Sequence, residues 1–135
     1  MSMPVAVVDI VDDNVEVLRS VGRVLSAHGY PVCMFTSAEL YLRTVEEGKA
    51  CCVVVSLGLR GTISGFDVAR AVRASGRALP VIFIAGSPDA AMKEEALLMG
   101  CLAHLEEPVS SELLITAVRS SGAASSWHPP PGPGR

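Results

Sequence analysis

A chain of 135 residues is long enough for one domain with a hydrophobic core. Half of its residues are hydrophobic and only 4% are aromatic, which favours a core of small aliphatic side chains. The net charge of −3 argues against direct nucleic-acid binding, and no apolar run approaches the ~20 residues of a membrane span.

The N-terminal segment has no basic stretch, so we do not expect a signal peptide. The four cysteines include no CxxC pair and match no zinc motif. We therefore expect a cytoplasmic protein without a membrane contact, whose thiols are reduced and lie in the core.

Apolar residues predict five strands that alternate with five helices. The expected strands are residues 5–11, 31–35, 51–55, 80–85 and 102–105. Each is followed by apolar residues at helical spacing, as at Leu18, Val21 and Leu25. The expected helices end near residues 29, 48, 76, 100 and 119.

Capping signals mark several helix starts. Thr36 and Ser64 each begin a capping-box pattern. Ser87 is expected to cap the fourth helix, with Pro88 at its first helical position, and Ser110 is expected to cap the fifth.

This alternation predicts a doubly wound α/β fold, in which a five-stranded parallel sheet carries helices on both faces. In such open sheets, functional groups gather at the carboxyl ends of the strands. The residues expected at those ends are Asp12, Asp13, Ser56, Ala85 and Glu107. We expect them to converge in space although they are scattered in sequence.

The composition shifts to Ser, Pro and Gly near the C-terminus. We therefore expect residues 1–120 to form the domain and residues 121–135 to form a disordered tail. Trp127 lies in that tail, where an exposed linker aromatic is the simpler interpretation and a docking anchor is the alternative.

Residues 8–14, which include the acid pair, resemble the first strand of a bacterial receiver domain. Further segments are similar to that family in the same order, namely residues 29–32, 35–39, 80–86 and 99–108. Over residues 4–119 the chain resembles the receiver domains of two-component response regulators, especially those of the FixJ/NarL group. The resemblance implies the (βα)5 flavodoxin-like fold of CheY-like proteins.

In that family the acid pair binds Mg²⁺, and an aspartate that ends the third strand accepts a phosphoryl group. A Thr or Ser ending the fourth strand and a Lys before a late proline bind the phosphate. By this correspondence, Asp12 and Asp13 form a weak site for Mg²⁺ or another divalent cation. The other three positions hold Ser56, Ala85 and Glu107.

Two more family positions are altered. His104 replaces the aromatic switch residue, and it is either a pH-sensitive switch or, more simply, an edge histidine without a role. Arg60 lies in the loop after Ser56, where the family usually has Pro.

These replacements change the expected chemistry. A carboxylate is ionised at pH 7, whereas the Ser56 hydroxyl needs an adjacent base that the motif does not supply. Glu107 adds an anion where the family has a cation. The repulsion among the three carboxylates is relieved by a protonated carboxyl, by a divalent cation, or by Arg60 as a counter-charge. In the simplest alternative, Glu107 points to solvent.

The sequence therefore predicts a degenerate receiver, or pseudo-receiver, that is not an enzyme and acts without phosphorylation through protein–protein interaction. The expected partner is a histidine kinase, an output protein or a second copy, bound through the face formed by residues 88–119. The alternative is the receiver half of a two-component DNA-binding transcriptional regulator, whose output domain is absent from this chain.

Overall fold

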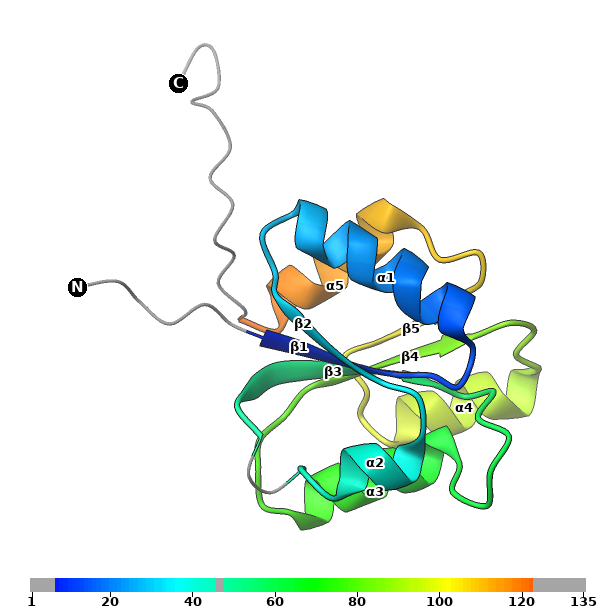
Figure 1. Ribbon diagram of the computed structural model, residues 1–135. Coiled ribbons are helices and arrows are strands. Elements are labelled where there is room, and N and C mark those ends of the chain that lie inside the picture. The colour runs from blue at the N-terminus through cyan, green and yellow to red at the C-terminus, as the bar shows by residue number, and fades with distance from the viewer. Residues whose placement is uncertain (1–6, 46–47, 123–135) are drawn as a thin grey trace.

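A computed structural model describes residues 7–45 and 48–122 and contains five strands and five helices in that part (Figure 1). The strands are β1 (Val7–Val11), β2 (Val32–Phe35), β3 (Ala50–Ser56), β4 (Val81–Ala85) and β5 (Ala103–Glu106). The helices are α1 (Val15–Ala27), α2 (Ala38–Leu42), α3 (Gly65–Ala74), α4 (Ala90–Leu98) and α5 (Ser111–Ser120).

The strands form one parallel sheet in the order β2-β1-β3-β4-β5. Helices α1 and α5 cover one face, whereas α2, α3 and α4 cover the other (Figure 1). The strand order reverses between β1 and β3, which are neighbours, so the carboxyl ends of these two strands form the topological switch point. The predicted doubly wound fold is confirmed.

Alternating side chains of the strands divide the core into two layers, because successive residues of a strand point to opposite faces. Val8, Ile10 and Val54 pack with α1 and α5, while Val11 and Val53 pack with α2 and α3. Every residue of β3 except Cys51 is buried, as expected of the central strand of a covered parallel sheet.

Two predicted helix starts are wrong by one or two residues. The cap of α2 is Ser37 rather than Thr36, because the Ser37 hydroxyl accepts the Leu40 N–H. The cap of α4 is Asp89 rather than Ser87, because its carboxylate accepts the Met92 N–H at 2.8 Å. A carboxylate is favoured at a helix N-terminus by the helix dipole as well as by the hydrogen bond.

Helix α2 is also shorter than the predicted helix, which was expected to continue to about Gly48. It ends at Leu42, and the N–H and hydroxyl of Thr44 both donate to the Tyr41 carbonyl at 2.9 Å. This local turn competes with continued helical bonding. The caps at Ser64 and Ser110 are confirmed, and Ser64 forms a complete capping box with Asp67.

The prediction that the thiols lie in the core is correct only for Cys52. Cys33 is exposed because β2 is an edge strand, and Cys51 and Cys101 are partly buried. None of the helices in the described ranges is long and apolar enough to span a membrane. The predicted tail beyond residue 122, with Trp127, lies outside the described residues.

Candidate functional site

The parallel pairing brings the predicted site residues to one edge of the sheet. Asp12 follows β1, Ser56 ends β3, Ala85 ends β4 and Glu107 follows β5. Ser56 pairs with Ile84, and the Glu107 N–H donates to the Ala85 carbonyl at 2.8 Å. The carboxyl ends of β1, β3, β4 and β5 are therefore adjacent, as predicted.

Asp12 is the most buried acid of the site, with 2% of its surface exposed. One carboxylate oxygen, Oδ1, accepts the Asn14 N–H at 2.9 Å, while the buried Oδ2 has no protein partner within the described part of the chain. Burial raises the pKa of Asp12 to about 6, although the Asn14 hydrogen bond opposes the change. The charges of Glu107 and Asp13 raise this pKa further.

Asp13 fixes the loop that follows β3. Its Oδ2 accepts the backbone N–H of Arg60 at 2.8 Å. Arg60 therefore contacts the acid pair through its amide, and its side chain is exposed. The ion pairs found within residues 7–45 and 48–122 involve neither Arg60 nor any of the three site carboxylates. A counter-charge role for the Arg60 guanidinium remains a prediction.

Ser56 is buried, with 5% of its surface exposed, and its Oγ accepts the Gly58 N–H at 3.0 Å. Gly65 packs directly against the backbone of Ser56, because a Cβ at position 65 would clash with the Ser56 carbonyl oxygen. The Ser56 hydroxyl thus stabilises the first turn of the loop and is enclosed by the start of α3.

Ala85 and Glu107 occupy the other two altered positions. Ala85 is buried and offers no hydroxyl to a ligand. The half-buried Glu107 side chain lies over Gly86, since a Cβ on Gly86 would lie 3.0 Å from the Glu107 Oε2. Glu107 consequently places its charge beside the buried Asp12, whose pKa it raises.

His104 lies apart from this group of side chains. It is half-buried in β5 and pairs with Phe83 of β4, two positions before the end of its strand. Its predicted roles, as a switch or as an edge residue, remain predictions.

Two features of the site had no sequence signal. Lys93 of α4 forms an ion pair with Glu106 at 3.1 Å, which places a cation beside the carboxyl end of β5. The close packing of Gly65 on Ser56 was also missed. Both depend on how α3 and α4 lie against the sheet, and residue spacing along one chain does not report that packing.

The residues present fit a metal ion poorly. Asp12 Oδ2 is an available oxygen, but the Asp13 Oδ2 already accepts an amide, and Ser56 replaces the third carboxylate. In the described part of the chain, no group of three or more His, Cys, Asp or Glu side chains is arranged to hold a metal ion. A divalent cation at Asp12 and Asp13 stays a prediction.

Comparison with known families identifies the fold and its class of function. The response regulator receiver domain model matches residues 8–119. This chain belongs to the response regulator receiver family. Receiver domains are signalling modules that interact with kinases and output domains rather than typical enzymes.

Curated relatives of this receiver are full response regulators. The response regulator protein TodT of Pseudomonas putida is 30% identical over 121 residues, covering 90% of this chain and 53% of TodT. The transcriptional regulatory protein FixJ of Azorhizobium caulinodans is 31% identical over 114 residues, covering 84% of this chain and 54% of FixJ. The receiver thus spans about half the length of these relatives.

Solved structures share the same fold. The crystal structure of FixJ-N matches with a TM-score of 0.79 and 28% identity, covering 93% of this receiver and 100% of that chain. A response regulator receiver protein from Pseudomonas putida matches with a TM-score of 0.80 and 24% identity, covering 88% and 99% of the two chains. Because the identity to the Pseudomonas putida structure is only 24%, that similarity supports the shared fold alone.

Proposed function

We propose that this protein is a degenerate receiver of a bacterial, cytoplasmic signalling system that acts without phosphorylation and without enzymatic activity of its own. The observation that carries the proposal is the arrangement of Ser56, Ala85 and Glu107 at one sheet edge. These residues occupy the positions of the nucleophile, the hydroxyl and the lysine of the family. In this proposal, residues 1–120 form the receiver domain.

The local chemistry supports the loss of phosphoryl transfer. The Ser56 Oγ is buried, accepts an amide hydrogen bond and has no histidine or lysine among its hydrogen-bond partners in the described residues. Phosphoryl transfer depends on positioning and charge neutralisation. An incoming phosphoryl group would instead approach Asp12, Asp13 and Glu107 without the lysine that balances such charge in the family.

The raised pKa of Asp12 supports a protonated carboxyl as the way in which repulsion among Asp12, Asp13 and Glu107 is relieved. A pKa of about 6 means that Asp12 holds its proton over more of the pH range than an ordinary aspartate. A partly protonated Asp12 lowers the charge beside Glu107 without any bound group. We therefore favour partial protonation of Asp12 over a bound cation as the means by which this receiver tolerates Glu107.

The face formed by residues 88–119 is proposed as the interaction surface. Only Ala96 of α4 is fully buried, while Leu97 and Leu98 of the same helix are 63% and 79% exposed. Leu113 of α5 is also largely exposed. Large apolar side chains at the surface favour a protein partner, which is a histidine kinase, an output protein or a second copy.

Sedimentation velocity, with and without acetyl phosphate and Mg²⁺, tests independence from phosphorylation. We expect the same distribution of species under both conditions. Leu98→Asp should weaken binding of a protein partner or of a second copy. The control Leu40→Asp on α2 should not, since Leu40 is also an exposed leucine, at 45% against 79% for Leu98, but lies outside residues 88–119. An association that appears only with the phosphodonor would refute the proposal.

A second function is favoured by the length of the relatives. Because this chain covers 54% of the transcriptional regulatory protein FixJ, it is alternatively the receiver half of a DNA-binding regulator. A longer reading frame in the source genome that continues into a helix-turn-helix domain would support this alternative. A stop codon directly after the codon of Arg135 would contradict it.

A further inference from the structure

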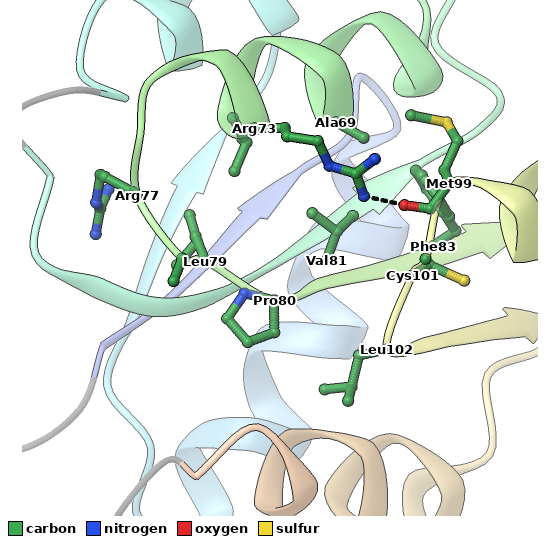
Figure 2. A pocket seen from close by; sticks show the side chains of 13 residues that line it. Ala69, Arg73, Arg77, Leu79, Pro80, Val81, Phe83, Met99, Cys101 and Leu102 are labelled. Atoms are coloured by element: carbon green, nitrogen blue, oxygen red, sulfur yellow. Dashed lines mark hydrogen bonds between the residues drawn. The ribbon is translucent and has the colours of Figure 1, made fainter.

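Figure 2 shows a hollow of about 500 Å³ from close by. It lies at the start of β4, whereas the altered phosphorylation site lies at the carboxyl ends of the strands. It is bounded by the C-terminal part of α3, by residues 77–81 leading into β4, and by residues 99–102 between α4 and β5. Its partly exposed apolar residues include Leu79, Val81, Met99 and Leu102. This volume falls in the range of small-molecule sites.

The described residues that line the hollow include two arginines and no acid. Arg77 is committed to the fold, because its guanidinium donates to the carbonyls of Val45 and Ala50 at 2.9 and 2.8 Å. Its charge also acts on the buried Asp9, whose pKa it lowers. Arg77 thus closes one end of the hollow as a structural residue.

Arg73 makes fewer contacts than Arg77, which donates to two backbone carbonyls, and than Arg70, which forms two ion pairs. Its guanidinium reaches across the hollow and donates to the Met99 carbonyl, and it has no carboxylate partner among the described residues (Figure 2). By contrast, Arg70, one turn earlier on α3, forms ion pairs with Asp67 and Glu95 at 3.0 Å. Arg73 therefore presents a guanidinium whose charge is not offset by a carboxylate within residues 7–45 and 48–122.

The helix ends determine which ligand suits this cation. Both α3 and α4 end beside the hollow, and helix C-termini carry partial negative charge on their last carbonyls. These carbonyls disfavour a bound anion and favour a hydrogen-bond donor. A guanidinium over an apolar cavity also attracts the face of an aromatic ring. A planar aromatic ring with an N–H group suits the apolar cavity, the guanidinium and the helix-terminal carbonyls.

We propose that the hollow binds an aromatic ring of the indole class, with the ring against Leu79 and Val81 and under the Arg73 guanidinium. The N–H group of the ring donates to a carbonyl at the end of α3 or α4. The hollow begins at the N-terminal end of β4, whereas Ala85 ends that strand. Binding at this site would therefore supply an input that does not use the family's phosphorylation site.

The indole ring has two sources, a free small molecule and a tryptophan side chain. The sequence contains one tryptophan, Trp127. Trp127 of the same chain must therefore be tested as the source.

An NMR titration of the ¹⁵N-labelled full chain with free indole tests the proposal. In a Trp127→Ala variant, indole should shift the amide signals of residues 79–81 and 99–102 saturably. Arg73→Gln should weaken this binding about two- to fivefold, because a cation–π contact at a partly exposed site contributes about 0.5–1 kcal/mol. Ala78→Leu should prevent binding, since Ala78 lines the mouth of the hollow and is exposed.

Arg70→Gln is the matched control, because it removes a guanidinium from the same helix but not from the hollow. Tighter indole binding by Trp127→Ala than by the unmodified chain identifies Trp127 as the natural occupant. Equal binding by the two identifies a free aromatic ligand. The proposal is overturned if Trp127→Ala shows no saturable shift, or if the shifts survive Ala78→Leu unchanged.

Discussion

Glu107 and Asp12 show how one substitution changes the electrostatics of the whole site. Asp12 is buried, and its Oδ2 has no partner among the described residues. Burial raises its pKa, and the charge of Glu107, which follows β5, raises it further. A lysine at position 107 would instead stabilise the ionised form of Asp12. The present arrangement therefore costs folding free energy that a lysine would recover.

We predict that Glu107→Lys increases the free energy of unfolding at pH 7 by about 1 kcal/mol, because a repulsive pair becomes an attractive one near a buried charge. Urea denaturation measures this difference. The control Glu94→Lys makes the same charge change at an exposed position of α4, and it should alter stability much less. If the two variants are equally stable, Glu107 does not act on Asp12.

Asp9 is a second buried acid, and it lies outside the site. Burial raises its pKa from 3.8 to about 6, and Arg77 offsets only part of this effect. The folded protein therefore keeps a proton that the unfolded chain releases between pH 4 and 6. Stability from this group is present below pH 4 and is lost as the pH rises through about 6.

We predict that Asp9→Asn is more stable than the unmodified protein at pH 8, by up to about 3 kcal/mol, and similar to it at pH 4. Unfolding free energies measured from pH 4 to 8 test this. Asp67→Asn should differ from the unmodified protein by a nearly constant amount over this range, because hydrogen bonds from Ser64 lower the pKa of Asp67 in the folded state, so its stabilising effect is lost only at lower pH. A constant difference between Asp9→Asn and the unmodified protein across the range would contradict the prediction.

At the scale of the elements, strands were easier to predict than helix ends. Buried runs such as 51–55 leave little choice of structure, and β3 extends this run by one residue at each end. Helix ends depend on which of several neighbouring polar residues caps the helix. Ser87 and Asp89 both satisfy the cap preference, and local sequence does not rank them.

The cap of α4 can be tested directly. We predict that Asp89→Ala lowers the unfolding free energy by about 1 kcal/mol, because it removes the acceptor of the Met92 N–H. Ser87→Ala should change the unfolding free energy by only about a few tenths of 1 kcal/mol. Thermal or urea unfolding of the two variants distinguishes them, and a larger loss for Ser87→Ala would restore Ser87 as the cap.

At the scale of the whole molecule, the alternation of strands and helices was sufficient to predict the sheet and the convergence of its strand ends. Parallel strands necessarily align their carboxyl ends, so the sequence alone was enough to group Asp12, Ser56, Ala85 and Glu107. Contacts made between elements were not predictable. The amide of Arg60 on Asp13 and the Lys93–Glu106 ion pair join residues that no sequence pattern links.

The central claim is that this receiver has kept the fold of its family but has lost its phosphoryl chemistry. Intact mass spectrometry after incubation with acetyl phosphate and Mg²⁺ tests it most directly. The triple variant Ser56→Asp, Ala85→Thr, Glu107→Lys restores the family residues and serves as the positive control. We predict a phosphoryl adduct on the triple variant and none on the unmodified protein; an adduct on the unmodified protein at Ser56 would contradict the claim.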